Sequence, residues 1–265
     1  MKKQTDGECM RIGAYQFKVT GSIEDNLIHI QEGVEKASGA GVRLLVFPEC
    51  AVTGYPPHCI RSAHDVQDDA VRSAHRRLQA LSQKHLMHLA VGTITEDGGK
   101  RYNSAVLFRP DGEGMVYAKR ALWGWDRENF AQGQSIGVTE ADSFKIGIRI
   151  CFEVRFPEYF RELYREKTDL NLILFYDVSE REDPDRLRLI KGHLQTRAVE
   201  NVCYTLSCNT CAPFQTAPTA LFDRSGKILA ELEGGKEGLL VYDLEKTPLT
   251  FGEAGRKEIS DSIVK

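Results

Sequence analysis

The chain has 265 residues and a mass of 29.8 kDa, enough for one large α/β domain or two small ones. Hydrophobic residues make up 42% and charged residues 28% of the sequence, which excludes disordered, collagen-like and coiled-coil proteins. The net charge of −3 provides no general basic surface, so nucleic acid is not an expected partner.

Neither secretion nor membrane insertion is predicted. No window approaches the ~18 consecutive apolar residues of a membrane-spanning helix. Residues 1–8 contain two lysines but no apolar stretch after them. The seven cysteines are an odd number, scattered through a chain large enough to fold without disulfides, which favours a reducing compartment. We therefore expect a cytoplasmic protein with no membrane partner.

The first half of the chain alternates strands and helices. The apolar run 10–17 predicts a strand, and Ser22 caps a helix whose apolar residues recur at helical spacing up to Gly39. Residues 42–47 predict a second strand, and 68–87 a second helix.

The next three strands are expected to pair as hairpins rather than through crossover helices. They are separated by the turn sequences Asp97-Gly98-Gly99 and Pro110-Asp111-Gly112. The predicted strands cover residues 88–95, 102–108 and 114–118.

The second half again alternates strands and helices, with buried strands at 144–150 and 170–175 and helices near 157–166 and 184–201. Four short strand-like runs follow and are predicted to form an antiparallel end to the sheet. These runs are residues 202–208, 218–222, 226–232 and 238–244.

The predicted fold is an α/β four-layer α-β-β-α sandwich. Two sheets, each covered by helices on one outer side, account for apolar strands that do not alternate cleanly and for helices with a single apolar stripe. The sequence contains no repeat, low-complexity tract or linker, so residues 1–265 are interpreted as one domain. Residues 246–265 are polar enough to form a C-terminal arm.

Three apolar strands are each followed directly by a reactive side chain, where a rigid scaffold usually places functional groups. These side chains are Glu49, Lys119 and Cys151. Each alone has an ordinary structural explanation, but the three types complement one another. A nearby cation and a helix N-terminus make a thiol a better nucleophile at neutral pH. A carboxylate can accept its proton, and an ammonium can stabilise an oxyanion.

The sequence resembles the nitrilase superfamily of carbon-nitrogen hydrolases over nearly its whole length. That family has a Glu-Lys-Cys triad in this chain order. The resemblance rests on the matching segments Pro48-Glu49, Thr53-Gly54-Tyr55, Lys119, Gly147 to Glu158, and Gln195 to Asn201. We interpret the last of these as structural, because Glu200 and Asn201 fall where a helix ends.

The resemblance implies a cofactor-free and metal-free hydrolase. Glu49 would be the general base, Cys151 the nucleophile, and Lys119 with the N–H of Phe152 would hold the oxyanion. Phe152 after the cysteine is more typical of amidases than of true nitrilases, which tend to have Trp there. A small-molecule amidase that releases ammonia through a thioester is therefore expected. The alternatives are an N-carbamoyl (ureido) hydrolase, a nitrilase, and a catalytically silent binding protein.

The family often has a further acid between the lysine and the cysteine. Glu128 fits by residue type and Asp126 by register, and we favour Glu128. Arg155 either binds a substrate carboxylate or holds its loop through Glu158 or another acid. The remaining candidates for lining the substrate pocket are Tyr55, Trp123 and Tyr176.

Two further expectations concern substrate and assembly. The family's usual Asn-Pro or Asn-Ala after a second-half strand is replaced by Phe175-Tyr176-Asp177-Val178-Ser179, which affects the polarity of the pocket. The apolar faces of the helices near 159–164 and 184–201, together with the resemblance, predict a homodimer or a higher homo-oligomer. Neither the spacing of the last three cysteines nor the pair His85 and His88 supplies a full set of metal ligands.

Overall fold

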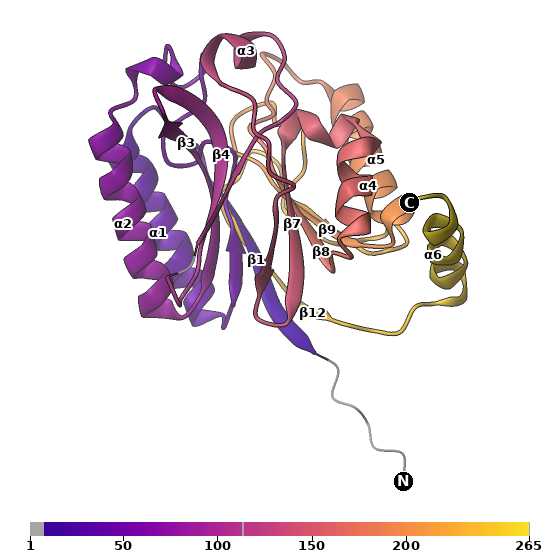
Figure 1. Cartoon of the computed structure of the whole chain (residues 1–265). Helices are drawn as coiled ribbons and strands as arrows, with labels where there is room; N and C mark the ends of the chain where they lie inside the picture. Colours follow the sequence, from indigo (N-terminus) through magenta and orange to yellow (C-terminus); the bar gives the residue numbers. More distant parts are fainter. Residues whose placement is uncertain (1–7, 113, 265) are drawn as a thin grey trace.

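The computed structural model describes residues 8–112 and 114–264, so the prediction made on residues 1–7 lies outside the described part. Two six-stranded sheets pack face to face, and helices cover their outer sides (Figure 1). Helices α1 (Ile23–Gly39) and α2 (Asp68–His85) cover the first sheet, and α4 (Pro157–Arg165) and α5 (Pro184–Asn201) cover the second. The predicted α-β-β-α sandwich is confirmed.

The first sheet has the strand order β12-β1-β2-β3-β4-β5. Strands β1, β2 and β3 run parallel, whereas β3, β4 and β5 form the two predicted hairpins. The bounds are β1 (Cys9–Gln16), β2 (Leu44–Val46), β3 (His88–Asp97), β4 (Lys100–Phe108), β5 (Met115–Ala118) and β12 (Gly238–Glu245).

The second sheet has the order β11-β10-β9-β8-β7-β6, with β7, β8 and β9 parallel. The predicted antiparallel end is correct for β9 to β11 and wrong for β12, which pairs antiparallel with β1 in the first sheet. This pairing places Leu240 and Leu244 in the core between the sheets. The bounds are β6 (Val138–Ala141), β7 (Phe144–Ile150), β8 (Leu170–Leu174), β9 (Tyr204–Cys208), β10 (Ala220–Phe222) and β11 (Ile228–Glu231).

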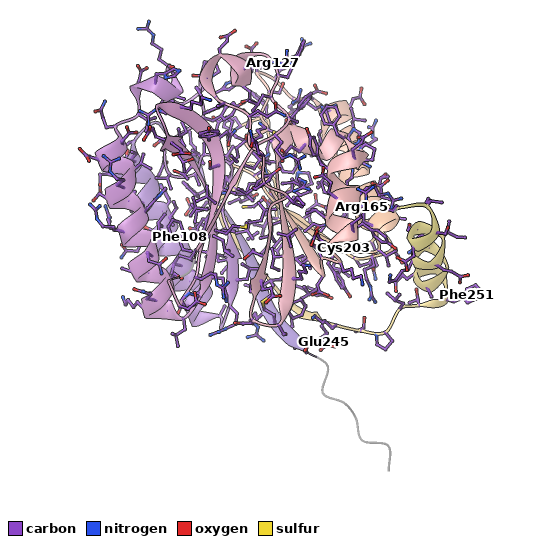
Figure 2. The ribbon with its side chains drawn as sticks, viewed as in Figure 1. Phe108, Arg127, Arg165, Cys203, Glu245 and Phe251 are labelled. Atoms are coloured by element: carbon purple, nitrogen blue, oxygen red, sulfur yellow. The ribbon has the colours of Figure 1, made fainter. Side chains whose placement is uncertain are left out.

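Side chains fill three apolar layers, one between the sheets and one under each pair of helices (Figure 2). Local signals set the helix ends: Ser22 Oγ accepts the N–H of Asp25 at the start of α1, and Asp183 accepts the N–H of Arg186 at the start of α5. The layers therefore hold the strand ends in fixed relative positions.

The predicted arm contains a helix, α6 (Phe251–Ile263), which begins at a capping box formed by Thr250 and Glu253. It contacts α5, and the Tyr164 hydroxyl of α4 donates to Asp261. Phe251 is 98% exposed and extends away from the body (Figure 2). Within the described residues, no helix is both long and apolar enough to cross a membrane.

The carboxyl ends of β2 and β5 lie at the same end of the first sheet. Strand β2 pairs in parallel with β3, and β5 runs in the same direction as β3 because two antiparallel pairings, β3 with β4 and β4 with β5, separate them. The strands β7 and β8 pair in parallel, so their carboxyl ends also lie at one end of the second sheet. Four short elements were not predicted: β6, η1 (Ala63–Asp65), α3 (Trp125–Asn129) and η2 (Cys151–Arg155). Both α3 and η2 carry candidate site residues.

Gly92 of β3 supports the segment that carries Glu49. A Cβ atom at this position would lie 2.2 Å from the carbonyl oxygen of Pro48 and 2.6 Å from Cα of Glu49, both backbone atoms. We expect Gly92→Ala to lower the free energy of unfolding by about 1–3 kcal/mol, because the backbone must shift to admit the methyl group. Urea unfolding measures the loss. At Gly39, the matched control, a Cβ atom meets nothing within 4 Å, so Gly39→Ala leaves stability unchanged or raises it. Equal stability of the two variants would contradict this account.

Candidate active site

Glu49 lies just beyond β2 and is held from both sheets. Its Oε1 accepts hydrogen bonds from Asn103 Nδ2 at 2.7 Å and from Lys119 Nζ at 2.9 Å, and its Oε2 accepts the backbone N–H of Tyr176 at 2.7 Å. The side chain is fully buried, and this burial raises the pKa of the carboxyl group above its usual value. Glu49 is therefore a fixed carboxylate of increased basicity.

Lys119 follows β5 and bridges two carboxylates. Its Nζ lies 2.9 Å from Glu49 Oε1 and 2.8 Å from Asp126 Oδ2, and its side chain is 1% exposed. Burial alone lowers the pKa of Lys119, but the two carboxylates outweigh it and hold the pKa well above its ordinary value. Lys119 is thus a permanent buried cation.

The structure places Asp126, not the favoured Glu128, in contact with Lys119. Asp126 is buried in α3, and its Oδ1 also accepts the Tyr55 hydroxyl at 2.7 Å. Glu128, two residues later in the same short helix, is exposed. Two helical positions apart, the side chains face different directions, so only one of them can point at Lys119. Our choice of Glu128 is corrected to Asp126.

Cys151 follows β7 and opens η2 with a φ of +44°, a conformation that non-glycine residues rarely adopt. The turn places its side chain in a cavity shared with Lys119. Burial and the charge of Glu49 raise the pKa of the Cys151 thiol well above its ordinary value, although Lys119 opposes this. The effect of a nearby cation is present, but burial outweighs it. The resting group is a thiol, which needs a base to ionise it.

Glu153 holds the turn of Cys151 against the segment of Lys119. Its Oε2 accepts the N–H of Ile150 at 2.7 Å, and its Oε1 accepts the N–H of Arg120 at 2.7 Å and the Tyr117 hydroxyl at 2.8 Å. The side chain is completely buried. Glu153 lies within the matching segment Gly147 to Glu158, and no role was predicted for it. In the structure it joins the ends of β7 and β5.

The cavity beside Cys151 has a volume of about 290 Å³, which suits a small molecule. All of the predicted pocket residues reach it, although not in the same way. Those lining it are Tyr55, Trp123, Phe152, Arg155 and Tyr176. Trp123 is 67% exposed at the mouth. Tyr55 and Tyr176 stack with ring centroids 5.2 Å apart.

The Arg155 side chain makes no hydrogen bond or ion pair with an acid in the described part of the chain, although its guanidinium lies 5.8 Å from the ring of Phe152. The alternative in which Glu158 holds Arg155 is therefore not what the structure shows. Arg197 instead holds the loop, because its Nε donates to the carbonyl oxygen of Val154 at 2.9 Å. The structural interpretation of the helix 195–201 agrees with that contact.

Two partners of Glu49 were missed by sequence reasoning. Asn103 could have been noticed as a polar residue inside the apolar run of β4, where it is 1% exposed. Tyr176 acts through its backbone N–H, which carries no residue-specific signal.

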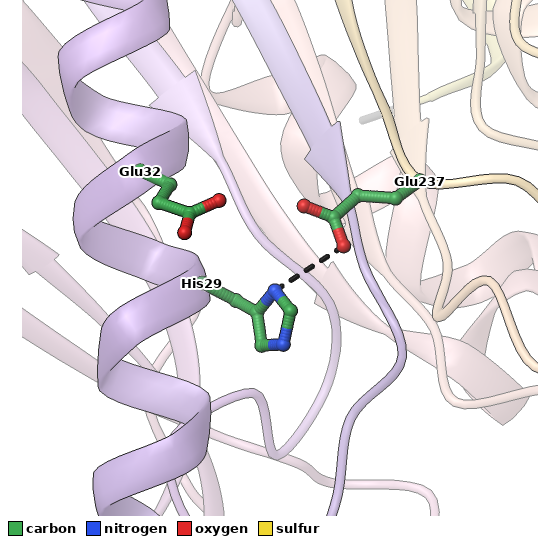
Figure 3. A group of neighbouring side chains, drawn as sticks. All are labelled: His29, Glu32 and Glu237. Carbon is green, nitrogen blue, oxygen red and sulfur yellow. Dashed lines mark ion pairs between the residues drawn. The ribbon is translucent and has the colours of Figure 1, made fainter.

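One group of possible metal ligands lies away from this cavity, on α1 and before β12. His29 Nδ1 is 3.2 Å from Glu237 Oε2, and Glu32 is its third member (Figure 3). Lys36 Nζ already lies 3.7 Å from Glu32 and 4.0 Å from Glu237, and the Tyr15 hydroxyl donates to Glu237. The carboxylates thus have a cation and a donor, and we assign the cluster to fold stability. All seven cysteines are free thiols.

The comparisons with known proteins agree with this geometry. Residues 11–247 match the family model described as carbon-nitrogen hydrolase. The chain is 29% identical to the 2-oxoglutaramate amidase of Bacillus subtilis, a match covering 88% of this chain and 90% of that protein.

Solved structures of an amidase from Nesterenkonia sp. AN1 superpose closely. A cysteine-to-alanine mutant in complex with butyramide has a TM-score of 0.79 and 26% identity, covering 89% of this chain and 91% of that one. Another mutant carries the acetamide moiety of fluoroacetamide on its active-site cysteine; its TM-score is 0.80 at 25% identity, with 94% and 93% of the two chains covered. With this family match over most of its length, the chain belongs to the carbon-nitrogen hydrolase family.

Proposed function

We propose that this protein hydrolyses the amide of a small molecule that also carries a carboxylate, through a thioester on Cys151. One observation carries the proposal. Lys119 and Cys151 line one small cavity, Lys119 holds the buried carboxylate of Glu49, and the cavity wall includes Arg155, which has no acidic partner among the described residues.

Acylation begins when Glu49 takes the thiol proton and the sulfur attacks the amide carbon. Charge develops on the carbonyl oxygen, where the ammonium of Lys119 and the N–H of Phe152 stabilise it. As the tetrahedral intermediate collapses, the C–N bond breaks and the proton on Glu49 moves to the leaving nitrogen, so ammonia departs. Cys151 then carries the acyl group as a thioester.

In deacylation, Glu49 again acts as the base, now towards water. Glu49 takes a proton from water while the water oxygen attacks the thioester carbon. The C–S bond breaks, the thiolate recovers the proton, and the free carboxylic acid leaves. The raised pKa values fit both half-reactions, because a thiol that stays protonated needs a base and burial makes Glu49 a stronger one.

The substrate class follows from Arg155. An unpaired guanidinium in a pocket wall suits a carboxylate, which it can bind through two parallel hydrogen bonds. The Bacillus subtilis relative is named for 2-oxoglutaramate, an amide that also carries a carboxylate. The alternative functions are hydrolysis of a ureido compound, hydrolysis of a nitrile, and binding without turnover. The experiments below distinguish them from the proposed amidase activity. A cytoplasmic location remains part of the proposal.

Ammonia release from an amide, a nitrile and a ureido compound tests the proposed activity. We expect the wild type to act on the amide, and Cys151→Ala to abolish turnover because it removes the nucleophile. Glu49→Gln should lower kcat/KM by about 10²–10⁴-fold, the range for a lost general base. Where deacylation suffers more than acylation, intact-mass spectrometry shows an acyl adduct on the Glu49→Gln protein. Near-normal turnover by Cys151→Ala would rule out the thioester.

Asp126 and Glu128 provide a matched pair for the second acid. We expect Asp126→Asn to reduce kcat by about 100-fold, because Lys119 loses one of its two carboxylates and even a 1 Å misplacement near the chemistry has an effect of this size. Glu128→Gln also removes one negative charge, but from the exposed side of α3, and should leave kcat unchanged. Steady-state kinetics on one amide compare the two. A larger loss for Glu128→Gln would restore the original assignment.

We also propose a homodimer formed through α4 and α5. The surface near these helices exposes Phe156 by 36% and Leu189 by 50%. A two-fold contact would cover such apolar groups on both copies at once. Sedimentation at micromolar concentration should give about twice the chain mass of 29.8 kDa, and Leu189→Asp should shift the protein towards monomer. A wild type that sediments only as a monomer would refute the dimer.

A further inference from the structure

The active-site cavity contains an ion pair for which the proposed reaction has no use. Asp177, three residues beyond β8, receives two parallel hydrogen bonds from Arg186 in the first turn of α5. The two bonds join Nε to Oδ1 at 2.9 Å and Nη2 to Oδ2 at 3.1 Å. Asp177 also lies in the segment Phe175 to Ser179, which replaces the Asn-Pro or Asn-Ala of the resembled family, so the pair belongs to a segment in which this chain departs from the family pattern.

The hydrogen bonds of Asp177 hold Arg186 in place and leave Asp177 itself little capacity to contact a substrate. Its side chain is 5% exposed, and its Oδ1 also accepts the Thr216 hydroxyl. Its backbone is fixed by Asn209, whose Oδ1 accepts the N–H of Asp177 at 2.9 Å and whose Nδ2 donates to the carbonyl oxygen of Asp177 at 2.8 Å. The carboxylate therefore has three donors from the chain itself and a rigid backbone behind it.

Arg186, by contrast, still has binding capacity. A guanidinium has five N–H donors, and the fork with Asp177 uses only two of them. Its side chain is 43% exposed and lines the same cavity as Cys151 and Arg155. The bonds to Asp177 hold the pKa of Arg186 above its usual value, so Arg186 stays charged.

Charge is distributed unevenly along the cavity. Lys119 and Asp126 line it together with Cys151, and Lys119 also contacts the buried carboxylate of Glu49 behind it. Arg155, Asp177 and Arg186 line the same cavity, and the side chain of Arg186 is 43% exposed. A neutral amide group therefore fits beside Cys151, and an anionic group fits beside the two arginines.

We propose that Arg186, positioned by Asp177, is the second cationic arm of an anion subsite that it forms with Arg155 at the mouth of the cavity. The inference rests on the proposed amidase function and deepens it. The preferred substrate is the monoamide of a short dicarboxylic acid, with its amide beside Cys151 and its carboxylate between the two guanidinium groups.

Two amides of almost equal shape test the subsite. Succinamate ends in a carboxylate, whereas butyramide ends in a methyl group. We expect Arg186→Ala to lower the ratio of kcat/KM for succinamate to that for butyramide by about 10- to 30-fold, the effect of losing a charged hydrogen bond at a partly exposed site. Asp177→Asn keeps Arg186 but weakens its fork, so the ratio should fall less. The matched control is Arg188→Ala, two residues along α5, where Arg188 is 77% exposed and paired with Asp185. This control should leave both activities unchanged.

Removing Arg186 alone leaves the buried carboxylate of Asp177 without its cation and could unfold the protein. The double variant Asp177→Asn/Arg186→Ala removes both charges while keeping the shape of residue 177. In this variant, the ratio of kcat/KM for succinamate to that for butyramide should fall as far as it does in Arg186→Ala. If the pair served only to fix the loop, thermal stability would fall in these variants while the ratio stayed at the wild-type value. That result would overturn the subsite.

A binding measurement separates failure of the subsite from failure of the proposed function. Calorimetric titration of Cys151→Ala with succinamate and butyramide needs no turnover. We expect tighter binding of succinamate, with the preference lost when Arg186→Ala is added and reduced by salt. If the wild type hydrolyses neither amide but this preference is found, the proposed function fails and the subsite stands. Equal affinities for the two amides, with or without Arg186, would disprove the subsite even where amides are hydrolysed.

Discussion

The active site depends on one buried ammonium group. Lys119 can remain charged without water because Glu49 and Asp126 both contact it, and removing one partner from such a pair leaves an uncompensated charge. The same contacts connect three segments, since Glu49 follows β2, Lys119 follows β5 and Asp126 lies in α3. An interaction that holds the first sheet's loops together is therefore also the electrostatic environment in which an oxyanion would form.

The second sheet contributes the nucleophile, and Glu153 ties it to the first. Cys151 adopts a strained positive φ, which persists only where its surroundings fix it. Glu153 does so by accepting hydrogen bonds from Ile150 on one side and from Arg120 and Tyr117 on the other. The position of the nucleophile relative to the segment of Lys119 is thus fixed by Glu153, which is not among the residues that line the cavity.

Sequence patterns predicted the layers and the three reactive side chains, because both follow from where apolar strands end. They failed where position depends on the path of a loop. Asp126 and Glu128 have equivalent chemistry, and only the coordinates of α3 decide which one faces Lys119. Likewise, β12 has an ordinary strand pattern, and its place beside β1 depends on the free edge of the first sheet. The effect of Lys119 on the Cys151 thiol could be anticipated, but the opposing effect of burial on its pKa could not, because the sequence does not show how deeply the thiol is buried.

The departure at Asp177 shows how specificity can change while the reaction stays the same. The residues around the reacting bond are fixed by mutual contacts across two sheets, so a substitution there disturbs several partners at once. Asp177 and Arg186 satisfy each other at the exposed end, where Arg186 is 43% accessible. A neutralised pair of this kind adds donors to the cavity mouth without adding net charge beside the nucleophile. In the proposed anion subsite, substrate choice would therefore depend on residues other than Glu49, Lys119 and Cys151, although both sets meet at one small cavity.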